Sequence, residues 1–298
     1  MNPKLQTTVV GSYPISYNVT EMMDSYFFQT KYSWESYIKE AVHDMLTAGI
    51  RIITDGQTRD PFIQLFTRKL KGCRIRHRTE IIDTIEYTQP ITISDQVFVR
   101  SIIPNNIQIK GVLTGPYTMS QSCVDLFYHN EREVAFAFAK ALHQEALLLD
   151  KIVDVISIDE PFFSNSMPDY ASDLIKTVVE HVKCPVTLHV CGDISSIIPN
   201  LIELPVSILS HEFKAKPKLL DIMKEYSFPQ KLCLGCVQSD HSRVESVEEI
   251  YNHIQKALHL FGEKIIHLAP DCGQRLLQRP VAFQKLQNLV KAGEQIYG

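Results

Sequence analysis

Short runs of apolar, β-branched residues alternate along the chain with longer amphipathic stretches. Eight such runs predict strands, at 7–10, 50–54, 107–113, 153–158, 185–190, 206–209, 231–234 and 265–268. The stretches between and after them carry apolar residues at helical spacing. They predict helices at about 33–48, 60–70, 131–149, 170–182, 194–202, 216–225, 246–261 and 280–296. Eight strand–helix pairs are typical of an α/β fold with a parallel sheet, namely the (β/α)₈ TIM barrel.

One segment, 72–106, breaks this rhythm because it alternates apolar and polar residues without helical spacing. We expect an inserted hairpin there. No Pro/Gly linker, composition shift or internal repeat divides the chain, so we expect a single domain over 1–298. A doubly wound open sheet is the alternative, but it calls for a Gly-rich phosphate turn after the first strand. Gly11-Ser12-Tyr13-Pro14 does not fit that pattern.

Composition narrows the class of protein. The 298 residues are 45% hydrophobic and 21% charged, with a formal net charge of -4. The chain has no basic stripe of the kind that binds phosphates, so we expect no nucleic-acid partner. It also has no apolar run of the roughly 18 to 20 residues that span a bilayer, and its start lacks the features of a signal peptide. We therefore expect a cytoplasmic protein whose seven cysteines are reduced and serve in burial, metal binding or chemistry.

Unusual polar residues follow nearly every predicted strand. In a barrel these positions share the face that carries chemistry. His189 and Cys191 lie two apart on one strand, point to the same side and can reach one ion. Glu212 follows the sixth strand and Cys272 the eighth, so a closed barrel brings all four over one mouth. This set of ligands suits zinc and disfavours magnesium or calcium.

A second cysteine pair offers a competing metal site. Cys233 and Cys236 have the spacing of a zinc or redox half-site, but no second pair completes it. Residues three apart on a strand point to opposite faces. We interpret the pair as buried small residues.

The motifs taken in order resemble one family, the zinc-dependent, cobalamin-independent methionine synthases. The likeness is to their catalytic C-terminal barrel and to the short archaeal-type forms that consist of that barrel alone, and it covers essentially the whole chain. The matching motifs are Val10-Gly11-Ser12-Tyr13-Pro14, Leu113-Thr114-Gly115-Pro116-Tyr117-Thr118 and Ile158-Asp159-Glu160-Pro161. His189, Cys191, Glu212 and Cys272 match the family's zinc ligands, with similar separations of 21 (191 to 212) and 60 (212 to 272). The resemblance implies a barrel of the methionine synthase and uroporphyrinogen decarboxylase-like type, with one zinc ion per chain.

The resemblance also implies an activity and roles for further residues. It implies methyl transfer to the thiol of homocysteine, with Ser12 and Asp159 holding the amino-acid end of that substrate. His241 matches a histidine implicated in proton handling at the methyl donor, and Asp271 a conformationally important acid. Taken alone, Ser12 also fits a turn, Asp159 a helix N-cap and His241 a loop position without a role.

Two departures from the family bear on substrate and donor. Gln57 stands where folate-using members carry a glutamate that contacts the substrate amino group. Ser122 stands near the place of their pterin-associated tryptophan, and the only tryptophan of the chain, Trp34, is far away in sequence. We therefore expect a methylcorrinoid donor, either methylcobalamin or a corrinoid protein, rather than methyltetrahydrofolate.

Other functions stay open at this stage. One is a zinc and corrinoid methyltransferase for another thiol such as coenzyme M, whose sulfonate calls for a cation such as Arg59 or Arg275. A second is a tetrapyrrole decarboxylase, which needs no zinc, so the four ligands argue against it. A third is a zinc-binding barrel without turnover.

Overall fold

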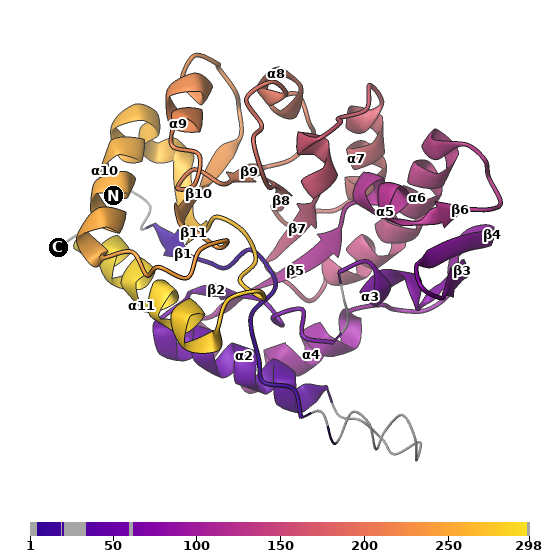
Figure 1. Cartoon of the computed structure of the whole chain (residues 1–298), viewed down its shortest axis with the longest axis horizontal. Helices are drawn as coiled ribbons and strands as arrows, with labels where there is room; N and C mark the ends of the chain where they lie inside the picture. The colour runs from indigo at the N-terminus through magenta and orange to yellow at the C-terminus, as the bar shows by residue number, and fades with distance from the viewer. Residues whose placement is uncertain (1–4, 19, 21–33, 60–61, 297–298) are drawn as a thin grey trace.

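The computed structural model describes residues 5–18, 20, 34–59 and 62–296. At its centre lie eight strands, β1 (Gln6–Thr7), β2 (Ile52–Ile53), β5 (Gln108–Thr114), β7 (Val155–Asp159), β8 (Val186–Val190), β9 (Ile208–His211), β10 (Lys231–Val237) and β11 (Ile265–Pro270). They form one sheet in the order β1-β11-β10-β9-β8-β7-β5-β2, with parallel neighbours. A bridge between Thr8 and Ile52 joins the two ends of that order, so the sheet forms a nearly closed barrel (Figure 1). The eight predicted strands and the TIM-barrel fold are confirmed.

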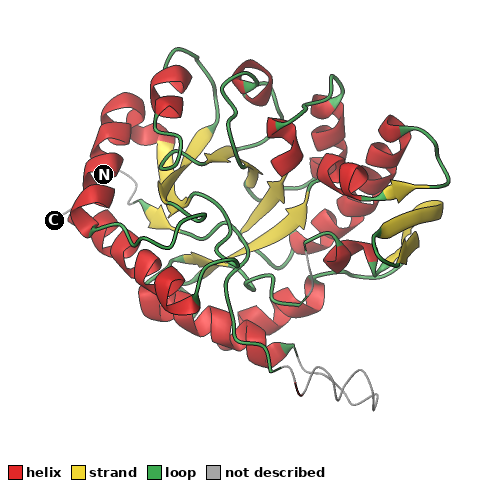
Figure 2. Cartoon of the chain, viewed as in Figure 1, coloured by secondary structure: helices red, strands yellow, loops and turns green. Residues whose placement is uncertain are grey.

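Helices cover the outside of the barrel (Figure 2). They are α2 (Glu35–Ala48), α3 (Gln64–Thr67), α4 (Ile93–Ile102), α5 (Pro116–Ser122), α6 (Glu131–Leu149), α7 (Ala171–Val179), α8 (Ile198–Leu201), α9 (Lys218–Met223), α10 (Val247–Phe261) and α11 (Arg279–Gln295), with single 3₁₀ turns η1 (Pro161–Ser164) and η2 (Gly262–Lys264). Side-chain caps begin two long helices, because Asn130 accepts from the Glu133 N–H and Ser246 forms a capping box with Glu249. Residue 33 of the helix predicted at 33–48 and residues 60–61 of the helix predicted at 60–70 lie outside the described residues. Of the latter prediction only α3 is helical.

The segment predicted as a hairpin over 72–106 contains a hairpin and, after it, a helix. Strands β3 (Leu70–Ile75) and β4 (Thr79–Tyr87) pair antiparallel, and β6 (Val124–Asp125) joins them in a small separate sheet. Later in the segment Ile93–Ile102 form α4, so the prediction is wrong there. Asp95 and Gln96 are buried in this helix, and Asp95 pairs with Arg59. Because polar residues occupy positions that face the core, the apolar residues of this helix do not show helical spacing in the sequence.

The inner face of the barrel carries buried polar side chains beside apolar ones. On β8, Leu188 and Val190 belong to the large core between sheet and helices, whereas Thr187 and His189 point the other way, into the barrel. A small apolar cluster of Ile208, Cys233 and Ala269, with Ile266 against it, packs apart from that large core. Branched apolar side chains usually fill such an interior. Here buried polar residues such as Thr187 and His189 share it with them.

The Cys233 and Cys236 side chains pack in different cores. Cys233 belongs to the cluster inside the barrel and Cys236 to the core beneath the helices. The prediction that they lie on opposite faces of one strand is confirmed.

Within the described ranges, no helix combines the length and the apolar character that crossing a membrane requires.

Candidate active site

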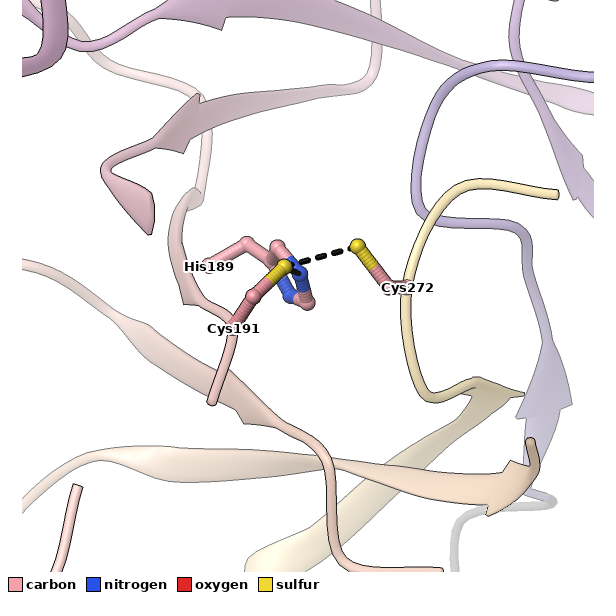
Figure 3. A group of neighbouring side chains, drawn as sticks. All are labelled: His189, Cys191 and Cys272. Atoms are coloured by element: carbon pink, nitrogen blue, oxygen red, sulfur yellow. Dashed lines mark hydrogen bonds between the residues drawn. The ribbon is translucent and has the colours of Figure 1, made fainter. Parts of the chain in front are cut away.

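Three of the four predicted metal ligands lie together at the mouth of the barrel. The ligand atoms of His189, Cys191 and Cys272 all lie within 4.8 Å of one another (Figure 3). His189 Nε2 is 3.0 Å from Cys191 Sγ, and the two sulfur atoms are 2.7 Å apart. Cys191 and Cys272 are 81 residues apart in the chain, so closure of the barrel brings them together.

The local chain explains how these side chains are held. His189 ends β8 and is 2% exposed, and Cys191 follows two residues later on the same side of the chain. Gly192 then turns the chain away with a φ of 85°, which few other residues adopt. Ser239 fixes Cys272 from both sides, because its Oγ accepts from the Cys272 N–H at 3.1 Å and donates to the Cys272 carbonyl at 2.7 Å.

The donor set fits zinc. Two sulfurs and one imidazole nitrogen are preferred zinc ligands, and tetrahedral zinc holds such atoms about 3.5–3.8 Å apart. The observed pairs at 2.7 and 3.0 Å need to separate by only about 1 Å to reach that spacing. Hydrogen bonds from Cys191 and His189 hold the pKa of Cys272 well below its usual value, and the bond to Cys272 raises the pKa of Cys191.

Glu212, the fourth predicted ligand, lies beside this group but not within it. It follows β9 and is half-buried. Its carboxylate accepts a hydrogen bond from the Gly192 backbone, and burial followed by the charge of Cys272 raises its pKa. Its oxygens are not among the ligand atoms that lie within 4.8 Å of one another. The structure therefore gathers three of the predicted ligands and holds Glu212 close by, on the loop that follows β9.

A cavity of about 270 Å³ opens directly onto the three ligands. The predicted substrate residues Ser12, Gln57 and Asp159 all line it. The other lining residues are Val10, Gly11, Phe62, Pro161, His189, Cys191, Cys272, Gly273, Arg275 and Leu276. The cavity therefore places the predicted metal ligands and the predicted substrate residues around one space.

The polar walls of the cavity differ in charge. Asp159 is 5% exposed and accepts from the Ser157 hydroxyl at 2.7 Å. Burial raises its pKa to about 6, so it is anionic above that pH. Gln57 is also buried, adopts a left-handed φ of 47° and has no hydrogen-bond partner for Nε2 among the described residues. Its neutral amide therefore lines the cavity with an Nε2 donor that no described residue satisfies.

Two further predicted residues lie outside the cavity lining. His241 is exposed, and its Nδ1 accepts from the Arg243 N–H at 2.8 Å. Asp271 is 2% exposed and accepts from the Lys214 and Ala215 backbone N–H groups at 2.9 and 2.7 Å. Burial raises the pKa of Asp271 to about 8. Asp271 thus fixes the loop that follows Glu212.

The two cations considered for an anionic substrate differ in position. Arg275 lines the cavity. Arg59 pairs instead with Asp95 and lies 5.8 Å from the centroid of the Trp34 ring. Sequence reasoning did not single out Phe62 or Ser239 as site residues. Ser239 belongs to the polar residues that directly follow β10, so the sequence could have indicated it as a site residue. No local feature of the sequence indicates Phe62.

Comparisons with known proteins agree on one family. Residues 5–295 match the sequence profile described as "Cobalamin-independent synthase, Catalytic domain". A methionine synthase of Methanocaldococcus jannaschii is 36% identical over 305 residues, covering 96% of this chain and 97% of that protein. One of Saccharolobus solfataricus is 29% identical over 314 residues, covering 97% and 94%. Among solved structures, a B12-independent methionine synthase from Shewanella sp. W3-18-1 in complex with selenomethionine has a TM-score of 0.83 at 23% identity, covering 98% of this chain and 97% of that one.

Proposed function

Because this chain belongs to the family of cobalamin-independent methionine synthases and is a methyltransferase, we propose that it methylates the thiol of homocysteine to form methionine. We further propose that His189, Cys191 and Cys272 bind one zinc ion, with Glu212 as a further ligand, and that the methyl donor is a methylcorrinoid.

One observation carries the proposal: the cavity joins a thiol-activating centre to an anionic group suited to an ammonium. The His189, Cys191 and Cys272 side chains form one wall, and Asp159 forms another. Homocysteine carries a thiol at one end and an ammonium and carboxylate at the other. This arrangement matches both ends of that molecule within about 270 Å³.

The residues of the chain divide the work between them. Zinc, when bound, lowers the pKa of a thiol so that the nucleophilic thiolate is present near neutral pH. Asp159 binds the substrate ammonium as a buried ion pair and thereby aims the thiol at the metal ligands. Gln57 contributes a neutral hydrogen bond to the same end. Ser239 keeps Cys272 in place through its two backbone hydrogen bonds.

The donor proposal rests on the lining of the cavity. Phe62 is the only Phe, Tyr or Trp among the described lining residues. The single tryptophan of the chain, Trp34, packs against Tyr37 with ring centroids 6.2 Å apart. The lining thus offers little aromatic surface for a pterin, which favours a corrinoid donor.

The test follows demethylation of methylcobalamin by reduced, zinc-reconstituted protein, from the change in the corrinoid absorbance. Homocysteine, coenzyme M, and homocysteine with methyltetrahydrofolate in place of the corrinoid are compared in parallel. We expect turnover with homocysteine and methylcobalamin. Turnover only with coenzyme M would transfer the proposal to a sulfonate thiol held by Arg275, and turnover only with the folate would overturn the donor.

A cysteine pair tests the metal centre separately. We expect Cys272→Ser to lose zinc, because it removes one of the sulfur ligands. Cys184→Ser is the matched control, since Cys184 is a half-buried free cysteine that precedes β8 and does not line the cavity. Equal zinc content in both variants, measured by metal analysis, would refute the site.

A further inference from the structure

A second cavity, which we call the N-terminal cavity, lies at the opposite end of the barrel from the metal ligands. Its volume is about 320 Å³, within the roughly 300–1,000 Å³ that is usual for small-molecule sites. Gln108, Val155, Ile208 and Lys231, which begin β5, β7, β9 and β10, all line it. It shares no lining residue with the active-site cavity. Chemistry in TIM barrels is confined to the carboxyl ends of the strands, so a ligand here binds apart from the reaction.

Three side chains of the N-terminal cavity have hydrogen atoms that the protein itself does not use. Gln108 Oε1 accepts from Gln6 Nε2 at 3.0 Å, while the Gln108 Nε2 group has no acceptor among the described residues. The Ser207 hydroxyl accepts from a backbone N–H at 3.4 Å and keeps its own hydrogen to donate. Lys231 gives one of its three ammonium hydrogens to a backbone carbonyl 3.2 Å away.

His267 is the buried polar side chain of this cavity. It lines the cavity, is 7% exposed and forms no side-chain hydrogen bond with a described residue. Burial, followed by the positive charge of Lys110, lowers its pKa to about 4. The ring is therefore neutral near pH 7 and offers one N–H donor. Because buried polar groups in proteins are normally paired, this unpaired ring points to a partner that a ligand supplies.

The charge in the N-terminal cavity is positive. Asp154 is the only carboxylate among the described lining residues. It is already neutralised, because Arg100 pairs with it at 2.7 Å and the Ile109 N–H donates to it at 2.8 Å. The described partner of Lys231, in contrast, is an uncharged carbonyl. Unused donors around one uncompensated cation match an oxyanion, which only accepts hydrogen bonds.

We propose that the N-terminal cavity binds a small oxyanion, either a carboxylate or a phosphate group, carried by a compact organic molecule. Lys231 supplies the counter-charge, and Ser207, Gln108 and His267 donate neutral hydrogen bonds. The apolar lining residues available to the organic part are Val155, Pro185, Ile208 and Ile266. The inference is independent of the proposed function, because it uses neither the metal ligands nor the active-site cavity.

The first test measures binding of inorganic phosphate, and separately of butyrate, to the zinc-reconstituted protein by equilibrium dialysis. We expect saturable binding of at least one of them at one site per chain, and the comparison identifies the oxyanion. Lys231→Gln should weaken that binding about 10-fold or more, because it removes a hydrogen bond between charged groups. Lys176→Gln is the matched control, since it makes the same charge change at an exposed lysine of α7 outside the cavity. No saturable binding of either probe, or equal weakening in both variants, would overturn the proposal.

The second test locates the bound probe. In protein with ¹⁵N-labelled histidine, the probe should shift the His267 nitrogen signals along the same saturation curve as the dialysis. His267→Gln keeps an N–H donor and should retain most of the affinity, whereas His267→Phe keeps a ring without a donor and should weaken binding. Unchanged His267 signals at saturation contradict the assignment.

A last variant separates the two ends of the barrel. Arg275 lines the active-site cavity, so Arg275→Gln should leave binding of the probe unchanged. If Arg275→Gln abolishes binding and Lys231→Gln does not, the oxyanion occupies the active-site cavity and the proposal is overturned. Failure of the protein to methylate homocysteine does not alter any of these outcomes, so the two proposals stand or fall separately.

Discussion

A buried ion pair outside the cavity lining supports the loop that holds Cys272. Lys285 of α11 and Glu245 of the loop between β10 and α10 are 2.8 Å apart, with side chains 0% and 1% exposed. Glu245 also accepts from the Gln238 N–H at 2.8 Å, and Lys285 donates to the Arg243 carbonyl at 2.5 Å. The pair therefore anchors both ends of the loop over residues 238–245.

We expect Lys285→Met to reduce the free energy of unfolding by about 3–5 kcal/mol, because it leaves the Glu245 carboxylate buried without its counter-charge. A double variant with Glu245→Gln has no uncompensated charge and should cost less than the sum of the two single changes. The same loop carries Ser239, which holds Cys272 by two hydrogen bonds. Zinc affinity should therefore fall together with stability.

Urea unfolding of the reduced protein measures the free energies. Lys256→Met is the matched control, because Lys256 pairs with Asp221 at 3.0 Å with both side chains 50% exposed. Exposed pairs contribute at most about 1 kcal/mol. If the two lysine variants unfold within about 1 kcal/mol of each other, the reasoning from burial is refuted.

Three further predictions concern the site and its supports. Glu212→Gln should weaken zinc binding less than Cys272→Ser, because its oxygens lie outside the group of ligand atoms within 4.8 Å; chelator competition on both variants checks the order. Burial raises the pKa of Asp55 from 3.8 to about 6, so the folded state binds the proton more tightly and loses stability as pH rises from about 4 to 6. Asp55→Asn should remove that loss, which amounts to up to about 3 kcal/mol. Urea unfolding at pH 5 and pH 8 checks this: if the reasoning failed, the difference in unfolding free energy between variant and wild type would be the same at both pH values. Gly115→Ala should destabilise the fold, because its Cβ would meet the Glu160 carboxyl carbon at 2.0 Å; an unchanged melting temperature would contradict this.

Local pattern was enough to predict the strands and most of the helices. The period of two residues in strands and of 3.6 residues in helices depends on a few consecutive side chains, so it can be recognised in the sequence without knowledge of tertiary contacts. The same holds for His189 and Cys191, which share a side of one strand because they are two residues apart. Helix α4 was not predicted, because its Asp95 is a polar residue that is buried by pairing with Arg59, which lies 36 residues away in the sequence.

By itself the sequence determined the barrel, and it predicted the candidate metal ligands and the end of the barrel at which they gather. The tertiary structure decided which of them meet: it brings Cys272 to Cys191, holds Glu212 beside them and leaves His241 exposed on its loop. It also decided that Gln108, Lys231 and His267 line one cavity at the other end of the barrel, which no spacing in the sequence reveals. These outcomes depend on strand register and barrel closure, which join residues far apart in the chain. Local preferences do not specify such long-range pairings, because they follow from packing of the whole barrel.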